Sequence, residues 1–400
     1  MKRTFLVGAT IGAVMLPLMA LAENTPGVTK TEIKIGATYP FSGPASAYAA
    51  TGRGVIAYID YLNDKGGING RKINFIALDD AYSPPKAVEQ VRRLVENEEV
   101  AFIFGLLGTP SNAATIKYLN SKKIPDLFIF SGGSKFTHFK EYPYTTTGIP
   151  SYMIEGRIYA KYIAEKMPNA KIALLYQNDD LGKDFLNALK AHFKDNFDKK
   201  VTAVSYEVTE PTIDSQVVNL KNSGADVFII ATTPKFAAQA LRKANEIDWK
   251  PVRLLNAVSS SIAMTLKPVG LDMSTGVITA AFIKDALDPK NADDPALKWY
   301  REMLTKYGPG VDVSDLNFIT GVNEGMILEQ VLKQCGDDVS RENVLKQSRN
   351  IKDLQLPLTL PGILVNTNEN NSQAFTQLQL QRFNGASWER FGDVVGVEPD

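Results

Sequence analysis

Small polar residues and glycines follow a predicted strand at residues 100–104, where the chain runs through Gly105-Leu106-Leu107-Gly108-Thr109-Pro110-Ser111-Asn112 into a predicted helix. Thr109 can cap that helix, and Pro110 suits its first position. The free amides and the positive dipole end of such a helix attract anions, and the Thr109 hydroxyl is a further donor. The loop therefore predicts a carboxylate site, with an ordinary helix cap that holds no ligand as the alternative.

A second group of small residues, Ser131-Gly132-Gly133-Ser134, ends the next predicted strand at residues 127–130. Glycine lets backbone amides approach a bound molecule closely, because it carries no side chain. The two loops together offer hydroxyl and amide donors without charge, which suits a carboxylate that binds reversibly. Neither loop contains an evident general base, so the pattern favours binding over catalysis.

Residues for other kinds of chemistry are scarce. The two histidines, His138 and His192, lie far apart in the sequence, and we expect the single cysteine, Cys335, to be a partly buried structural thiol at a helix end. The common patterns of hydrolases, zinc proteases and phosphate-binding loops are absent from the sequence. We therefore expect no catalytic site, no metal and no cofactor.

The charges of the chain are balanced, with 44 Lys and Arg against 44 Asp and Glu. A chain this close to neutrality gives no electrostatic reason to bind nucleic acid or an anionic membrane. The expected partner in the cavity is therefore a small molecule, and the protein is expected to be a monomer.

The first 22 residues have the pattern of a cleavable secretory signal: a basic start at Lys2 and Arg3, an apolar stretch, and Ala20 and Ala22 at the spacing of a cleavage site. A membrane anchor is the alternative, but the apolar run is interrupted by glycine and proline and is followed at once by a polar loop. We predict cleavage after Ala22 and a soluble periplasmic product.

From residue 31 onward, β-rich runs alternate with amphipathic helical stretches. Strands are expected at residues 33–38, 73–79, 100–104, 127–130, 171–176, 201–208, 227–230 and 252–256, and helices at 46–64, 84–98, 110–121, 151–166, 182–193, 211–223, 235–247, 295–306 and 317–334. A hairpin is expected at 373–392, with its turn at Asn384-Gly385. Two such series predict two doubly wound α/β lobes of parallel-type sheet, hinged with a cleft between them. The expected division is 31–148 plus 281–368 for the first lobe and 149–280 plus 369–400 for the second.

Several short motifs occur in a fixed order near the start of the first series. They are Ile33-Lys34-Ile35-Gly36, Pro40-Phe41-Ser42-Gly43-Pro44, Asn63-Asp64-Lys65-Gly66-Gly67-Ile68-Asn69-Gly70-Arg71-Lys72, and Asp79-Asp80. With these motifs the chain resembles the periplasmic leucine/isoleucine/valine-binding proteins, the type I solute-binding components of ABC importers, over nearly its whole mature length. The resemblance implies a two-lobed fold, hinge closure on a small solute, and an inner-membrane ABC permease as partner.

The resemblance also implies roles for individual residues. In that family the ligand carboxylate meets a hydroxyl residue at a helix start, which matches Thr109, and amides and a hydroxyl after the next strand, which match Gly132, Gly133 and Ser134 beside Ser131. Tyr48 matches an aromatic position that walls the ligand side chain. Hinge crossovers are expected, by the same pattern, near Gly148, Gly276 and Asn368.

The chain departs from the amino-acid binders where those proteins hold the ammonium group. The corresponding stretches, 148–152 and 254–258, contain no acid, and Leu181 stands where a ligand-contacting tyrosine is usual. Burying an ammonium without a countercharge would cost roughly several kcal/mol of binding free energy. The closest resemblance is to a subgroup with the motifs G-T-P-S-N-A-A and F-x-x-S-G-G-S-K-F, which implies benzoate-like, phenylpropanoid or short oxo-acid ligands. We expect Tyr48, Tyr152, Leu181, Phe236 and Asn256 to face the carboxylate site, with core or surface packing as the alternative for each of the four apolar or aromatic residues taken singly.

Three alternatives stay open. An amino acid would need Glu155, Asp179 or Asp180 to turn inward and hold its amine, although these acids also suit helix starts. An exported hydrolase would need a nucleophile and a base, and no histidine stands at a strand end to serve Thr109 or Ser131. A sensory receptor domain would need a separate membrane partner, because no signalling segment follows the fold in this sequence.

Overall fold

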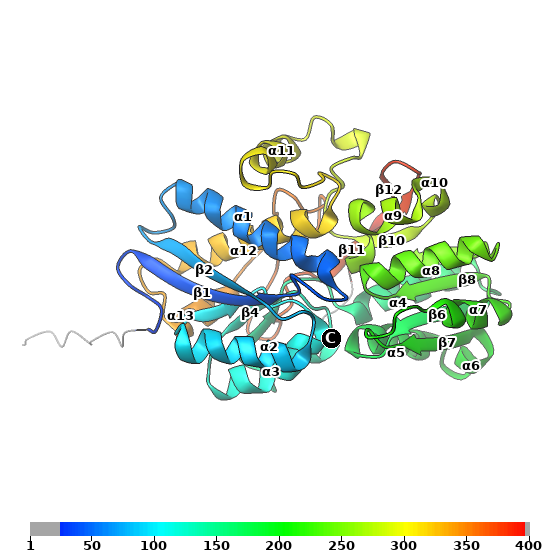
Figure 1. Ribbon diagram of the computed structural model, residues 1–400, viewed down its shortest axis with the longest axis horizontal. Coiled ribbons are helices and arrows are strands. Elements are labelled where there is room, and N and C mark those ends of the chain that lie inside the picture. The colour runs from blue at the N-terminus through cyan, green and yellow to red at the C-terminus, as the bar shows by residue number, and fades with distance from the viewer. Residues whose placement is uncertain (1–24, 397–400) are drawn as a thin grey trace, which may run out of the picture.

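Runs of β-branched and aromatic residues form two separate sheets in the computed structural model, which describes residues 25–396 (Figure 1). The predicted leader at residues 1–22 lies outside the described residues. The strands of the first sheet are β1 (Glu32–Tyr39), β2 (Lys72–Asp79), β3 (Phe102–Phe104), β4 (Asp126–Ile129) and β5 (Thr145–Thr147). Those of the second sheet are β6 (Ile172–Gln177), β7 (Val201–Tyr206), β8 (Val227–Ala231), β9 (Val252–Leu255), β10 (Ile278–Ala281), β11 (Gln377–Phe383) and β12 (Trp388–Gly396).

The order of the strands is that of doubly wound sheets. The first sheet runs β2-β1-β3-β4-β5, and its neighbouring strands pair in parallel. The second runs β12-β11-β10-β9-β8-β6-β7, parallel from β10 to β7, with β11 antiparallel to both of its neighbours. The predicted fold of two α/β lobes is confirmed, and so is the hairpin, whose turn is closed by Asn384 N donating to Ser387 O at 3.1 Å.

Helices cover both sheets. They are α1 (Ala49–Asp64), α2 (Pro84–Arg92), α3 (Thr109–Ser121), α4 (Tyr152–Lys166), α5 (Asp180–Phe193), α6 (Phe197–Lys200), α7 (Asp214–Asn222), α8 (Pro234–Glu246), α9 (Lys267–Val269), α10 (Leu271–Ser274), α11 (Pro295–Tyr307), α12 (Leu316–Cys335) and α13 (Arg341–Ser348). In the first lobe, α1 and α12 lie above the sheet and α2 and α3 below it in Figure 1. The expected place of Cys335 at a helix end is confirmed, since it is the last residue of α12 and is buried.

Alternation along the strands explains why helices are needed on both faces. Ile172 and Leu174 of β6 pack in the core that contains α4 and α5, whereas Ala173 and Leu175 pack in the core that contains α7 and α8. Successive side chains of a strand point to opposite faces, so an apolar strand must be covered twice. The strands β5 and β10, the helix α13 and the short helices α6, α9 and α10 were not predicted from the sequence.

Glycines bring α1 and α12 into direct backbone contact. A Cβ at Gly54 would lie 2.2 Å from the carbonyl oxygen of Phe318, and a Cβ at Gly321 would lie 2.1 Å from that of Thr51. Any other residue would force the two helices apart. The close approach fixes the positions of the first turns of both helices, which face the second lobe.

Candidate functional site

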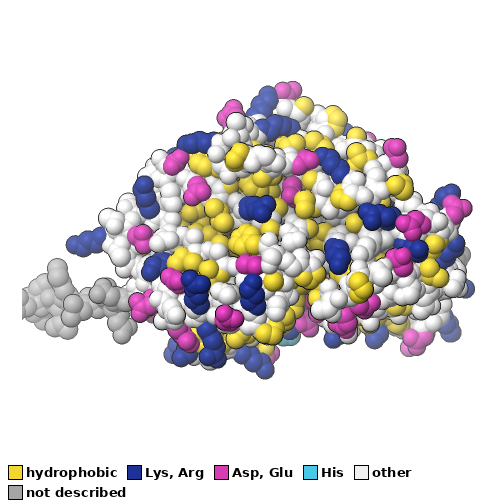
Figure 2. Space-filling view, in the orientation of Figure 1, with side chains coloured by type: hydrophobic (Ala, Val, Ile, Leu, Met, Phe, Trp, Pro, Cys, Tyr) yellow, Lys and Arg dark blue, Asp and Glu magenta, His cyan; other side chains and the backbone are white. Residues whose placement is uncertain are grey.

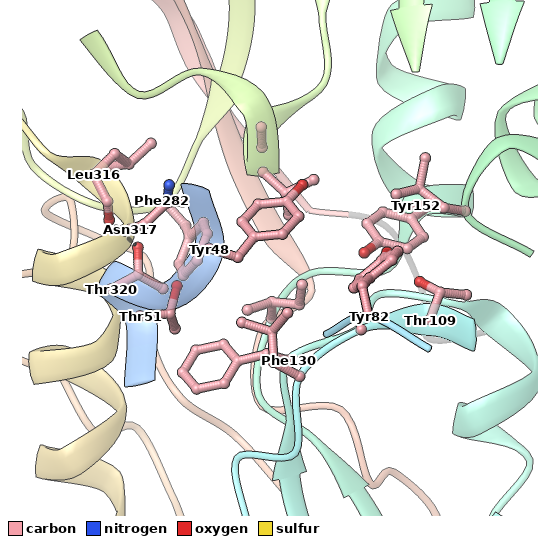
Figure 3. A pocket seen from close by; sticks show the side chains of 16 residues that line it. Tyr48, Thr51, Tyr82, Thr109, Phe130, Tyr152, Phe282, Leu316, Asn317 and Thr320 are labelled. Atoms are coloured by element: carbon pink, nitrogen blue, oxygen red, sulfur yellow. Dashed lines mark hydrogen bonds between the residues drawn. The ribbon is translucent and has the colours of Figure 1, made fainter. Parts of the chain in front are cut away.

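A cavity lies between the lobes, at the carboxyl ends of strands of the first sheet, as the topology predicts (Figure 3). The space between its walls, together with the part that is open to solvent, is about 550 Å³. Five aromatic side chains face it, and none of its lining residues is acidic, basic or a histidine. The lining residues are Tyr48, Thr51, Tyr82, Leu107, Gly108, Thr109, Phe130, Ile149, Tyr152, Leu181, Ala257, Val258, Phe282, Leu316, Asn317 and Thr320.

Thr109 forms one polar end of this cavity. It is the first residue of α3, and the capping residue is Gly108, at φ 109°, so the prediction that Thr109 caps the helix is wrong by one position. The side chain is therefore not engaged in capping, and its hydroxyl lies 2.8 Å from that of Ser131. Within the described residues, the amides of Thr109 and Ser111 have no acceptor. Uncompensated amides at a helix start are the donors that an anion needs.

Tyr152 completes this end from the second lobe. Its amide donates to Gly132 O at 2.8 Å, which fixes the start of α4 against the first lobe. Burial raises the pKa of Tyr152 to about 12, against the opposing effect of the neighbouring Thr109 hydroxyl, so the phenol stays protonated and can donate. A Cβ at Gly132 would lie 2.3 Å from Pro150 O, so this contact requires glycine.

A buried acid positions Tyr82 beside Thr109. One oxygen of Asp80 accepts from Tyr82 N at 2.8 Å, and the other accepts from the hydroxyls of Thr38 at 2.9 Å and Ser111 at 3.0 Å. These bonds hold Tyr82 at φ 58°, a backbone region that is rare for a bulky residue. The role of Asp80 is thus to join the loop after β2 to the start of α3, and its side chain does not line the cavity.

The three acids considered for holding an amine all have structural partners. Glu155 Oε1 accepts from Tyr159 at 2.7 Å and from Ala257 N at 2.8 Å, and burial raises the pKa of Glu155 to about 8. Asp179 caps α5 through Leu181 N at 3.0 Å, and burial raises its pKa to about 6. Asp180 pairs with Lys135 of the other lobe. None of the three lines the cavity.

The structure brings four of the ten predicted residues to the cavity wall: Tyr48, Thr109, Tyr152 and Leu181. The other six do not line it. Ser131 lies behind Thr109, and its hydroxyl accepts from Gly133 N at 3.3 Å, so that amide is already engaged. Gly132 contributes its carbonyl to Tyr152, as described above.

Ser134, Phe236 and Asn256 have roles in the fold instead. Ser134 donates through its amide at 2.7 Å and its hydroxyl at 2.8 Å to Asp184 of α5, so it joins the two lobes. Phe236 is fully buried in the core of the second lobe, with its ring 4.4 Å from that of Tyr206. Asn256 is bonded to the backbone of Thr232, through Thr232 O at 3.0 Å.

Sequence reasoning missed the contribution of the first turns of α1 and α12. Thr51, Leu316, Asn317 and Thr320 line the end of the cavity opposite Thr109 (Figure 3). Three of them come from α12, which begins more than 180 residues beyond the predicted loop at residues 131–134, and no local motif marks them. The available signal was the pair of glycines in α1 and α12, which indicates close helix packing.

Other kinds of site are not formed in the part of the chain that the structure describes. Between residues 25 and 396, no group of three or more His, Cys, Asp or Glu side chains is placed to hold a metal ion. None of the helices described there is long and apolar enough to cross a membrane. Figure 2 shows basic and acidic side chains intermixed over the face that it presents, with neither sign gathered into one patch.

Known proteins share this architecture. A family model described as "Periplasmic binding protein" matches residues 32–387. Leu/Ile/Val-binding protein homolog 7 of Brucella abortus is 25% identical over 379 residues, which is 92% of each chain. A branched-chain amino acid ABC transporter protein from Thermus thermophilus, solved with bound valine, has a TM-score of 0.81 at 16% identity over 93% of this chain and 98% of its own.

A fatty acid ABC transporter substrate-binding protein from Thermomonospora curvata gives a TM-score of 0.77 at 20% identity over 94% of this chain and 95% of its own. At such identities the two solved structures establish a shared fold. The family model matches most of the sequence and therefore establishes membership of the family. The chain belongs to the periplasmic binding protein family, is similar to the Leu/Ile/Val-binding relatives, and is a binding protein and not an enzyme.

Proposed function

We propose that the cavity binds a small carboxylate with an aromatic or other apolar body and no amino group, for delivery to an ABC permease. The observation that carries this proposal is the cavity wall: five aromatic side chains, no charged residue, and one end rich in neutral donors. Thr109, Tyr152 and the amides at the start of α3 would share the negative charge of the ligand. Several neutral hydrogen bonds compensate for desolvation of a carboxylate and still allow its release.

The same wall argues against an α-amino acid. An ammonium group loses its hydration in a closed cleft and needs a carboxylate partner. Glu155 and Asp179 are held by Tyr159 and by the start of α5, and burial raises the pKa of each. To serve an ammonium, either acid would have to break its own hydrogen bonds, and Glu155, with a pKa of about 8, would also have to lose a proton.

We further propose that the ligand is enclosed by hinge closure between lobes formed by residues 31–148 with 281–368 and 149–280 with 369–400. Strands of the first sheet all precede Gly148, and those of the second fall before residue 282 or after residue 376. Contacts across the cleft rim, Lys135 with Asp180 and Ser134 with Asp184, support a closed form that a permease recognises. In this proposal the mature chain is a periplasmic monomer cleaved after Ala22.

Matched ligand pairs test the proposal most directly. Phenylpyruvate and phenylalanine share one skeleton and differ at the oxo or ammonium group, as do the oxo acid of leucine and leucine itself. We expect phenylpyruvate, benzoate or phenylpropanoate to raise the melting temperature of residues 23–400, because a ligand at 100 times its Kd stabilises by about 2.7 kcal/mol. Titration calorimetry then gives each Kd. Binding of the amino acids in place of their oxo acids would overturn the ligand assignment and leave the transport role intact.

Branched-chain amino acid binding is the second candidate. It is favoured by the Brucella relatives, whose names give leucine, isoleucine and valine as ligands. The matched pairs separate the two candidates, because leucine and valine would then bind and their oxo acids would not.

A further inference from the structure

The cavity has a second polar end, formed by Thr51 of α1 and by Asn317 and Thr320 of α12, opposite Thr109 (Figure 3). We infer that this end recognises an uncharged hydroxyl group at the far end of the ligand, so that the ligand is a hydroxylated aromatic acid. The inference rests on the proposed function, because it assumes that the carboxylate lies at Thr109.

The three side chains have hydrogen-bonding capacity that the protein leaves unused. Asn317 Nδ2 makes one long contact with Ala47 O, at 3.4 Å, and Asn317 Oδ1 accepts no bond within the described residues. Thr320 donates its hydroxyl to Leu316 O at 2.6 Å, which leaves its oxygen lone pairs available. The Thr51 hydroxyl forms no hydrogen bond within residues 25–396. A hydroxyl on a ligand both donates and accepts, so it complements this set.

The positions of these side chains are fixed by the fold. Backbone contact of α1 and α12 at Gly54 and Gly321 holds Thr51 and Thr320 at the same end of the cavity. Thr51 is 3% and Asn317 6% exposed, and what remains accessible of their side chains lines the cavity. A ligand that enters the cavity displaces water from these groups, and it must supply hydrogen-bond partners of its own if affinity is not to be lost.

The end carries no charge, which excludes several other groups. The amides at the start of α12 are already engaged, Leu316 N with the Ser261 hydroxyl at 3.3 Å and Asn317 N with Asp315 at 3.0 Å, so this end lacks the free amides that a second carboxylate would need. The nearest acid along the chain, Asp315, caps α12 through Asn317 N at 3.0 Å and accepts from Ser261 at 3.2 Å, so it is not free to hold an amine. A neutral donor and acceptor is the group that remains.

Aromatic side chains occupy the space between the two polar ends. In Figure 3, Tyr48 and Phe130 lie between Thr109 on one side and Thr51, Asn317 and Thr320 on the other. Tyr48 lines the cavity, and its hydroxyl is buried without a partner. Flat walls favour a ring between the two polar groups, because aromatic pairs gain from stacked or edge contacts.

Two pairs of acids test the inference by calorimetry: benzoate with para-hydroxybenzoate, and phenylpropanoate with para-hydroxyphenylpropanoate. We expect the hydroxylated acid of at least one pair to bind roughly 3- to 10-fold tighter, the gain from one neutral hydrogen bond. Thr320→Val and Asn317→Leu should each move this affinity ratio toward one. Thr305→Val is the matched control: it removes the same helical threonine bond, to Arg301 O at 3.0 Å, on the exposed side of α11, and should leave the ratio unchanged.

Equal or tighter binding of the unsubstituted acids, or a ratio that persists in both variants, would overturn the inference while the proposed function stands. Failure of all four acids to bind, with binding of an amino acid, would overturn both. Asn317 lies in the first turn of α12, so its replacement could disturb folding, and melting curves of both variants would detect this. If Asn317→Leu is misfolded, the affinity ratio of Thr320→Val tests the inference.

Discussion

Replacing Thr109 with valine is the sharpest test of the carboxylate site. The two side chains have similar shape, so the change removes a hydroxyl from a residue that is 1% exposed and creates no sizeable void. In the free protein the lost bond is the 2.8 Å contact with Ser131, whose hydroxyl keeps the Gly133 amide as a partner at 3.3 Å. The free energy of unfolding should therefore fall by only about 0.5–1.5 kcal/mol.

The effect on binding should be larger. A hydrogen bond to a charged group is worth about 1.5–3 kcal/mol, so loss of the Thr109 donor should weaken carboxylate binding by roughly 10- to 100-fold. Tyr152 and the helix amides remain, which is why we expect a weakened site and not an abolished one. Titration calorimetry with the tightest acid from the ligand panel measures the change.

Thr115→Val provides the matched control. Thr115 lies on the same helix, is equally buried, and donates its hydroxyl to Ser111 O at 2.9 Å, but it does not line the cavity. We expect a similar small loss of stability with an affinity within twofold of the native protein. If Thr109→Val retained native affinity, or if both variants weakened binding equally, the placement of the carboxylate at the start of α3 would be refuted.

Three further predictions concern stability and closure. A Cβ at Gly148 would lie 1.7 Å from Glu324 Oε1 and 2.7 Å from the backbone oxygen of Phe128, so Gly148→Ala should lower the free energy of unfolding by about 1–3 kcal/mol in urea titrations, and a neutral result would contradict the packing. Burial raises the pKa of Asp126 from 3.8 to about 8, so the folded protein keeps a proton that the unfolded chain releases. The stability of the native protein relative to Asp126→Asn should thus decrease as pH rises from about 4 to 8, by up to about 1.4 kcal/mol per unit, and a flat difference would exclude this titration. Lys135→Ala removes the partly exposed pair with Asp180 across the cleft, so it should weaken ligand binding by less than about fivefold, with the difference lost in high salt.

The proposed carboxylate end of the site could be predicted in part from the sequence, because its main loop is local. The loop at residues 105–112 has a recognisable pattern, and the rule that ligands bind at strand ends placed it at one edge of a sheet. Thr109 accordingly lines the cavity. Residues 131–134 have a similar pattern after the neighbouring strand, but none of them lines the cavity. The helix cap was predicted one residue too late. The capping residue is Gly108, at φ 109°, and glycine has no side-chain acceptor by which a cap could be predicted.

Other predicted residues were displaced from the cavity by demands of the fold. The spacing of apolar residues in a helix does not show whether Phe236 faces a ligand or the core. In α8 it faces the core, beside Tyr206. Ser134 has the right chemistry for a carboxylate, but Asp184 from the other lobe already binds both its amide and its hydroxyl. Neither competing partner is visible in the local sequence.

The sequence by itself determined the two α/β lobes, the edge of the sheet at which the cavity lies, and the neutral character of the cavity end around Thr109, because alternation of strands and helices and the residues after each strand are local properties. Tertiary structure alone decided what lies opposite. Thr51, Asn317 and Thr320 meet only because Gly54 and Gly321 let α1 and α12 touch, although the two helices stand more than two hundred and fifty residues apart in the chain. Such a contact depends on packing between segments that are distant in the sequence, and short-range sequence patterns do not predict it.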